Sequence, residues 1–218
     1  SKVLFALDRA KKAVLREKTA LLCEGQLDVI SCHEEGVDHA IAPLGTAFTR
    51  EHARLLRRYT NHVLACYDSD KAGVAASERL FRELAPEGIS MRVVCMPAGD
   101  DPDTYIKAHG VDAFRGLLTE AKEFFDFKLE HARAQGVLDS PAGRTAALTE
   151  CAEILSLMGD VASRENQINS VVAHLQTSST ALRQEIARLK AKPQRVARDQ
   201  SGTSEENQAP TVPTPMHR

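Results

Sequence analysis

The sequence predicts an α/β protein in which a parallel sheet flanked by helices is followed by a small all-helical subdomain and a disordered tail. Short apolar runs alternate with helical patterns through the first part of the chain. The strand pattern ends near Lys122, and large apolar residues almost vanish after Pro193. Short apolar strands that alternate with helices are typical of a parallel sheet with both faces covered. We therefore expect three regions, which are residues 1–118, 119–192 and 193–218.

The first region is predicted to open with an amphipathic helix. Val3, Leu7, Ala10 and Val14 recur at the spacing of one helix face, so residues 2–16 are expected to be helical. Four short and mainly apolar strands are expected next, at residues 19–23, 40–44, 62–67 and 91–96. Helical patterns follow the first three of these strands, at residues 26–35, 50–59 and 71–84.

The second region is predicted to be all helical. Phe124 lies in the first of its helices. Further helices are expected at residues 141–158, 164–175 and 179–189. The serines before the last helix offer good N-capping hydroxyls. After Pro193 the chain is rich in Gln, Ser, Thr, Glu and Pro, a composition that cannot bury enough apolar surface to fold.

Composition excludes several classes of protein. The sequence has no run of about 18 apolar residues and no signal-peptide pattern, so we expect a cytoplasmic chain without membrane association. A net charge of −2 and a pI of about 6.4 argue against a broad basic surface for nucleic acid. The five cysteines are scattered without the spacing of a zinc site, so we expect buried thiols and no zinc.

Acidic residues follow three of the four predicted strands. Glu24 follows the first strand, Asp68 and Asp70 follow the third, and Asp101 and Asp103 follow the fourth. The carboxyl ends of parallel strands share one edge of a sheet, where ligands bind. Clustered carboxylates repel one another unless a cation neutralises them, and oxygen ligands without His or Cys suit Mg²⁺ or Mn²⁺. The pattern therefore predicts a divalent metal site.

Neighbouring residues support this interpretation. Asp68 and Asp70 are two positions apart, so in an extended chain both side chains point to the same side. Gly25 and Gly73 leave room beside the acids for a phosphate or a nucleotide. Asp28 lies one turn into the helix after the first acid, where it is expected to bond backbone amides or a metal-bound water.

Three features also have a second interpretation. Asp103 could instead cap a helix expected at residues 104–109. Lys71 could contact phosphate or simply cover the start of its helix, although a cation there opposes the helix dipole. The one local basic cluster is either a nucleic-acid contact or a solvated helix face, and it consists of Arg50, Arg54, Arg57 and Arg58.

These motifs resemble the Toprim domain, which is shared by DnaG-type primases, type IA and type II topoisomerases, and some nucleases and recombination proteins. Its marks are Glu-Gly after the first strand and Asp-x-Asp after a later one, here Glu24-Gly25 and Asp68-Ser69-Asp70. Longer strings are similar to bacterial DnaG-type primases, namely LCEGQLDV at 22–29, PLGTA at 43–47, YDSDKAG at 67–73 and GDDPDT at 99–104. The resemblance covers residues 1 to about 118 and continues more weakly to about Lys192.

The resemblance implies a DNA primase, which makes short RNA primers for replication on a single-stranded DNA template from ribonucleoside triphosphates. It implies that Glu24, Asp68 and Asp70 bind catalytic Mg²⁺, for which Mn²⁺ could substitute. Asp101 and Asp103 would help to hold a second ion. It also implies a primosome protein in the bacterial cytoplasm, near the nucleoid, with a replicative helicase as partner.

The sequence departs from the family pattern in several places. Gln26 stands where an aromatic residue is frequent, and Ser69 stands where the family has glycine. The zinc-binding domain and the basic N-terminal polymerase region have no counterpart in these residues, and we expect the helicase-binding domain to be missing as well. We therefore expect the chain to be unable to make primers alone.

Two other functions fit the same acids. A Toprim nuclease or topoisomerase-related protein would use them to cleave a strand. A topoisomerase also needs a nucleophilic tyrosine, however, and Tyr59, Tyr67 and Tyr105 all lie inside the Toprim-like region. The third function is a non-catalytic module that binds a nucleotide or a partner. Metal-dependent binding without primer synthesis would favour this module.

Overall fold

A six-stranded mixed sheet forms the centre of the first region in the computed structural model, which describes residues 3–45, 47–68, 71–97 and 99–191. The strand order is β1-β3-β2-β4-β5-β6. The strands are β1 (Leu4–Phe5), β2 (Ala20–Leu22), β3 (Ala40–Pro43), β4 (His62–Asp68), β5 (Ser90–Met96) and β6 (Lys122–Glu123). β2, β3, β4 and β5 pair in parallel, which confirms the four predicted strands and the fold class.

The two edge strands were not expected from the sequence. β1 pairs antiparallel with β3, and β6 pairs antiparallel with β5. Each has only two residues, which is too few to leave a strand periodicity. The helix expected at residues 2–16 therefore begins later, as α1 (Leu7–Glu17), after Ala6 adopts a left-handed φ of 62°.

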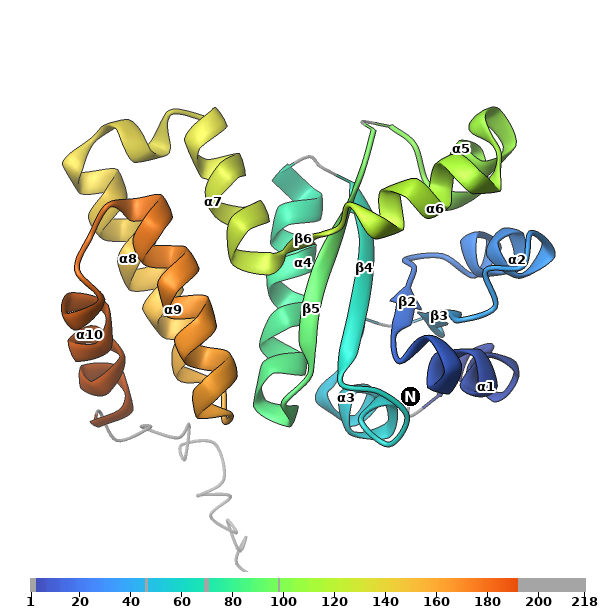
Figure 1. Cartoon of the computed structure of the whole chain (residues 1–218), viewed down its shortest axis with the longest axis horizontal. Helices are drawn as coiled ribbons and strands as arrows, with labels where there is room; N and C mark the ends of the chain where they lie inside the picture. Colours follow the sequence, from blue (N-terminus) through green and yellow to red (C-terminus); the bar gives the residue numbers. More distant parts are fainter. Residues whose placement is uncertain (1–2, 46, 69–70, 98, 192–218) are drawn as a thin grey trace, which may run out of the picture.

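Helices cover both faces of the sheet and form a separate group beside it, as Figure 1 shows. The sheet region contains α1, α2 (Gln26–Glu34), α3 (Arg50–Leu56), α4 (Lys71–Leu84), the 3-10 turn η1 (Ala85–Glu87), α5 (Pro102–His109) and α6 (Val111–Thr119). The second region contains α7 (Phe124–Ala134), η2 (Val137–Asp139), α8 (Pro141–Ser156), α9 (Val161–Leu175) and α10 (Ser179–Ala191). No described helix is long and apolar enough to span a membrane. The predicted tail lies outside the described residues.

Successive residues of the strands build two separate cores. Leu21 and Leu64 face the core under α2, α5 and α6, whereas Ala20, Leu22 and Ala65 face the larger core on the other side. This alternation is the side-chain period of a strand, and burial on both faces explains why the strands are apolar throughout. All five cysteines are free, and four of them are buried, as expected.

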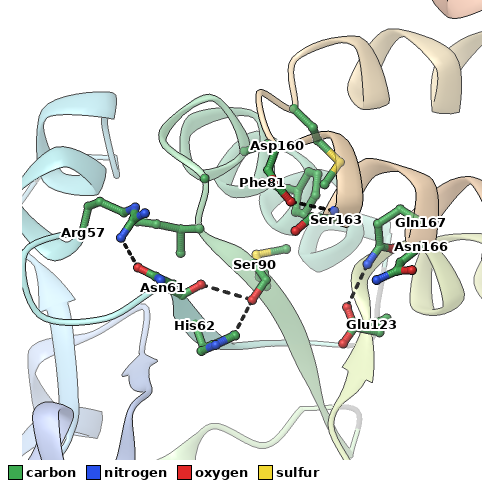
Figure 2. Close-up of a pocket in the computed structure, with 15 residues that line it drawn as sticks. Arg57, Asn61, His62, Phe81, Ser90, Glu123, Asp160, Ser163, Asn166 and Gln167 are labelled. Atoms are coloured by element: carbon green, nitrogen blue, oxygen red, sulfur yellow. Dashed lines mark hydrogen bonds between the residues drawn. The ribbon is translucent and has the colours of Figure 1, made fainter.

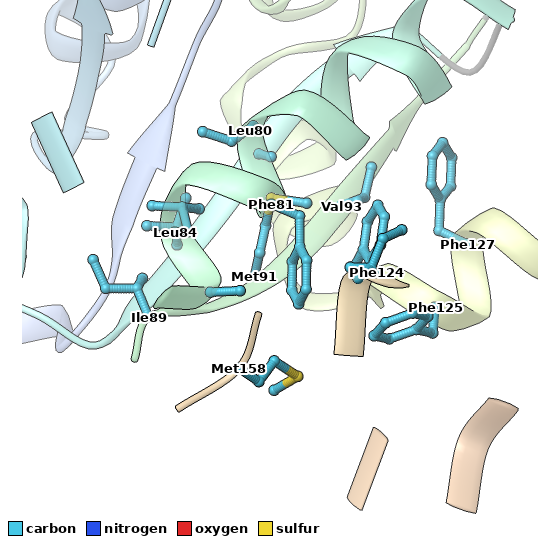
Figure 3. Packing of buried hydrophobic residues seen from close by; sticks show 14 of the residues in the cluster. Leu80, Phe81, Leu84, Ile89, Met91, Val93, Phe124, Phe125, Phe127 and Met158 are labelled. Carbon is cyan, nitrogen blue, oxygen red and sulfur yellow. The ribbon is translucent and has the colours of Figure 1, made fainter. Parts of the chain in front are cut away.

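Aromatic residues join the second region to the sheet region, as Figure 3 shows. Phe81 of α4 stacks on Phe124 of α7 with ring centroids 4.4 Å apart and an interplanar angle of 9°. Phe125 meets Phe81 edge-on at 5.6 Å. All three side chains are buried. We call this contact between α4 and α7, together with the ion pair of Lys128 and Glu78 at 2.7 Å, the seam.

Candidate active site

The chain positions that follow β2, β4 and β5 lie side by side at one edge of the sheet, which we call the carboxyl edge. In the parallel register Leu22 lies opposite Ala65, and Asp68 lies opposite Met96. This is the arrangement in which acids after separate strands can approach one another. Asp70 lies outside the described residues, and nothing is described of the side chains of Asp68 and Lys71, so their roles stay predictions.

Glu24 is exposed at the end of β2. It makes no hydrogen bond or ion pair with any other described residue. A cation that binds this carboxylate would break no hydrogen bond or ion pair with a described residue. Glu24 is therefore the predicted ligand whose described surroundings fit a divalent metal best.

Asp28 bonds the start of its own helix. The amide of Gly25, which is the N-cap of α2, donates to Asp28 Oδ2 at 3.0 Å. A Cβ atom added to Gly25 would lie 2.9 Å from that oxygen, so a side chain here would push the carboxylate aside. Glycine at this position therefore has an intramolecular reason in addition to the expected approach of a ligand. Gly73, the other predicted glycine, is buried near the start of α4.

Burial is the main reason why the pKa of the Asp28 carboxyl is raised. The negative charges of Asp101 and Asp103 raise this pKa further, while the Gly25 amide partly offsets the effect. Asp28 is only 7% exposed. The acids after β5 therefore act electrostatically on Asp28 in α2.

The acids after β5 have different partners. Asp101 is the N-cap of α5 and accepts from the Thr104 amide at 2.7 Å through Oδ1. Asp103 accepts from Ser31 with Oδ1 and from Lys107 with Oδ2, the latter at 2.8 Å, and these bonds lower its pKa, with Lys107 the larger cause. The cap of this helix is thus Asp101 rather than Asp103. Both Asp103 oxygens are engaged, whereas no described residue bonds Asp101 Oδ2, so Asp101 has the more accessible carboxylate of the two.

The described residues contain no group of three or more His, Cys, Asp or Glu side chains that could hold a metal ion. The predicted set relies on Asp68 and Asp70, and neither side chain is among those described. The metal site therefore stays a prediction. The described members of the set offer only carboxylate oxygens, which suits a hard divalent cation.

A cavity of about 670 Å³ adjoins Glu24 at the carboxyl edge. Tyr67, Phe48 and Arg79 line it together with Glu24. Burial and then the charge of Glu24 raise the pKa of Tyr67 to about 12, whereas Arg79 works against this shift. The cavity therefore brings a cation and two aromatic side chains to the exposed acid. The sequence interpretation missed Arg79, whose only signal is its place about two turns into the helix after the Asp-x-Asp motif.

The predicted basic cluster lies elsewhere. Arg50 and Arg54 both donate to Glu87 Oε1, at 2.5 and 3.1 Å, and Arg57 donates to the Glu87 carbonyl at 3.0 Å. The bonds from Arg50 and Arg54 lower the pKa of the Glu87 carboxyl, with Arg50 the largest cause. Glu87 precedes the start of β5, so the cluster belongs to the opposite edge of the sheet from the acids. This placement favours the solvated, structural interpretation of the cluster over contact with nucleic acid at the metal site.

Comparison with known proteins agrees with this geometry. A family described as Toprim-like matches residues 21–106. The DNA primase of Synechococcus elongatus is 33% identical over 180 residues, which is 80% of this chain and 26% of that protein. The primase of Enterococcus faecalis is 31% identical over 199 residues, covering 90% of this chain and 32% of that one. The chain belongs to the DnaG-type DNA primases.

Solved primase structures support the same assignment. A DNA primase domain from Pseudomonas aeruginosa superposes with a TM-score of 0.73 at 26% identity, over 84% of this chain and 59% of that one. A DnaG primase catalytic domain bound to single-stranded DNA gives a TM-score of 0.71 at 29% identity, over 83% and 58%. Residues 1–118 alone could not supply such coverage, so helices of the second region also have counterparts in these primase domains.

The second region corrects one expectation. Residues 125–179 match a family described as the DnaB-helicase binding domain of primase. The expectation that the helicase-binding domain is missing was therefore wrong, because η2, α8, α9 and all of α7 except its first residue lie within that match. Helical spacing alone gave no signal of a partner. The chain spans 26–32% of the length of the first primases that it matches.

Proposed function

We propose that this primase chain supplies the metal centre for DNA-templated synthesis of RNA primers. The main support is the exposed Glu24 at the carboxyl edge, beside a cavity of about 670 Å³. The ligands would be Glu24, Asp68 and Asp70, with Asp101 more available than Asp103 for a second ion. The substrates would be a single-stranded DNA template and ribonucleoside triphosphates.

The described residues beside Glu24 would hold the incoming nucleotide. Arg79 is exposed on α4 and lines the cavity, so its guanidinium can bind a phosphate. Phe48 and Tyr67 offer aromatic surface to a base or a ribose. Bound Mg²⁺ would supply charge stabilisation and alignment of the phosphates for transfer to a primer 3′-hydroxyl.

Metal binding to this chain tests the proposal directly. Isothermal titration calorimetry with Mn²⁺ should detect binding, and Glu24→Gln should weaken it by at least about tenfold, or roughly 1.4 kcal/mol. Glu17→Gln is the matched control, because Glu17 is an exposed acid at the end of α1, remote from the carboxyl edge. Equal weakening by both variants, or by neither, would contradict the metal assignment.

Primer synthesis tests the enzymatic part of the proposal. We infer that this chain needs the N-terminal regions of a longer primase for template binding, because its net charge is −2 and two members of its arginine cluster, Arg50 and Arg54, are paired with Glu87. In a chain extended by those regions, Asp68→Ala or Asp70→Ala should abolish primer synthesis without changing the circular dichroism spectrum. Synthesis retained by both variants would remove these ligands from the proposal.

We also infer that the second region binds a DnaB-type replicative helicase, on the strength of the match to residues 125–179. Two large apolar side chains in this range are exposed, Val137 at 44% and Val161 at 60%. Exposed apolar residues are frequent anchors of protein interfaces. Val137→Asp or Val161→Asp should weaken helicase binding in calorimetry, whereas Leu15→Asp, equally exposed but outside the match, should not. Full affinity in both valine variants would contradict this surface.

A further inference from the structure

A second cavity, of about 480 Å³, lies between the sheet and the second region, at the edge opposite to the acids (Figure 2). His62 and Ser90, which are the first residues of β4 and β5, form one wall. Gln167 and Asn166 of α9 face them from the other side, next to Glu123 of β6. The volume is within the range of pockets for small molecules. We call it the amino-edge cavity, because it lies where β4 and β5 begin. None of the predicted metal ligands lines it.

The wall from the sheet side carries positive charge and donors. His62 Nδ1 and Ser90 Oγ lie 2.6 Å apart, and Ser90 Oγ donates to the Asn61 carbonyl at 3.1 Å. Arg57 also lines the cavity and is exposed, and it donates to the Glu87 carbonyl and to Asn61 Oδ1 while its charge still faces this wall.

A smaller hollow of about 290 Å³ continues from this wall. It shares Arg57, Asn61 and His62 with the amino-edge cavity and adds the exposed Lys18 and Arg58. The sheet side therefore suits the anionic end of a ligand.

The wall from the helical side presents acceptors. Gln167 Nε2 donates to Glu123 Oε2 at 3.1 Å, while Gln167 Oε1 is buried without a hydrogen-bond partner. A buried acceptor without a partner costs about 1–3 kcal/mol, so a ligand that donates to this oxygen once the Gln167 side chain turns towards the cavity is favoured. Asp160 adds a second carboxylate, which caps α9 through the Ser163 amide at 2.6 Å. The helical side therefore suits a ligand with N–H donors.

The floor between the two walls is apolar. Phe81, Ile89, Met91 and Met158 line it, and each is at most 9% exposed. A flat aromatic ring can cover such a floor while its edge meets the polar walls. Side-chain amides, here those of Asn61, Asn166 and Gln167, are common partners for the edges of nucleobases.

We propose that the amino-edge cavity binds a nucleotide whose base carries an amino group. The base lies on the apolar floor and donates to Gln167 Oε1 and Glu123, while the phosphate points to Arg57, Arg58 and Lys18. Acceptors on one side and cations on the other match the two ends of this ligand class. Because the site joins the sheet to the second region, its occupancy would affect how these two parts pack. The proposal does not depend on the metal centre.

The test uses nucleoside monophosphates with the whole chain in excess EDTA, so that divalent metal cannot contribute. Titration of ¹⁵N-labelled protein with GMP, AMP or CMP should shift the side-chain amide resonances of Asn61, Asn166 and Gln167. UMP, whose base offers only its N3–H and no amino group, should bind more weakly. Gln167→Leu should weaken binding roughly three- to tenfold, which is the effect of one lost hydrogen bond. Met158→Trp should abolish binding because the larger ring fills the cavity.

A control variant separates this site from the carboxyl edge. Gln26→Leu changes an exposed glutamine at the start of α2 and should leave binding unchanged. Thermal unfolding of each variant shows whether it is folded. If Met158→Trp does not fold, Gln167→Leu alone tests the site. The proposal is overturned by unshifted amide resonances at millimolar nucleotide, by full affinity in Gln167→Leu, or by inorganic phosphate binding as tightly as the nucleotides.

Discussion

The seam and the carboxyl edge of this primase chain differ in how they treat apolar and charged side chains. At the seam, Phe81, Phe124 and Phe125 pack away from water, and Lys128 is held by Glu78 at 2.7 Å. At the carboxyl edge, Glu24 is exposed. The only buried acid among the described residues is Asp28, whose pKa is raised. The seam therefore carries stability, whereas the carboxyl edge keeps charges that a folded chain would otherwise avoid. Substitutions at the two places should differ accordingly.

The largest effect is expected from Phe124→Ala. This buried ring stacks on Phe81, so its removal should lower the free energy of unfolding by about 3–5 kcal/mol, as large cavities in cores do. Urea unfolding followed by circular dichroism measures the change. Phe48→Ala is the control at the carboxyl edge, where the ring is half-buried, and it should cost clearly less. Equal losses would break the distinction between seam and edge.

Lys128→Met should have the next largest effect. The Lys128 side chain is only 12% exposed and bonds both Glu78 and Glu150, so its loss leaves Glu78 without its main partner across the seam. We expect a loss of about 1.5–3 kcal/mol in the same unfolding experiment. Lys107→Met, which removes the exposed partner of Asp103 at the carboxyl edge, should change stability much less. A larger loss of unfolding free energy from Lys107→Met than from Lys128→Met would contradict the expectation that the seam contributes more to stability than the carboxyl edge.

Asp101→Ala should cost about 1 kcal/mol, because it removes the N-cap of α5. Asp101→Asn keeps an oxygen that can accept from the Thr104 amide and should retain most of the stability. Both variants lack the negative charge of Asp101, but only Asp101→Ala also lacks an oxygen that can cap the helix. The difference between the two therefore measures the cap. If Asn were as destabilising as Ala, the charge of Asp101 rather than its cap would stabilise the helix.

The smallest effect is a gain in stability. Because the pKa of Asp28 is raised in the folded chain, ionisation of this group opposes folding as pH rises above its unfolded value of about 3.9. Asp28→Asn keeps an acceptor for the Gly25 amide and loses the charge. The variant should therefore be more stable than the parent near neutral pH, with the difference shrinking as pH falls towards about 4. A difference that grows on acidification would contradict the sign of this shift.

Sequence patterns located the centre of the sheet because its strands are buried on both faces. Runs such as residues 62–67 and 91–96 are apolar enough to predict strands without any knowledge of their neighbours. β6 has only Lys122 and Glu123, and its pairing depends on β5 rather than on its own residues. Leu4 and Phe5 lay inside the helix predicted at residues 2–16 but form a strand. Their partners in β3 lie almost 40 residues away, so no local pattern could indicate this pairing.

For the candidate site, too, the positions of residues along the chain were predictable, but the contacts of their side chains were not. Strand ends place Glu24 correctly from local pattern alone, and one-turn spacing places Asp28. The partners of the side chains were not predictable, because Ser31 reaches Asp103 and Glu87 reaches Arg50 from distant parts of the chain. The choice between Asp101 and Asp103 as the cap depends on whether α5 starts at residue 102 or 104, and residue patterns seldom fix a helix start so closely.

The two-residue strands at either side of the sheet have a consequence for the behaviour of this chain in solution. An open strand edge offers unpaired amides and carbonyls to any other chain with an extended segment, which is a common route to aggregation. β1 and β6 are the outermost strands on the two sides of the sheet, and each is only two residues long, which is too short to pair stably with another chain. The residues of β6 are also charged, namely a lysine and a glutamate. Short and partly charged edge strands of this kind disfavour the addition of a strand from another chain.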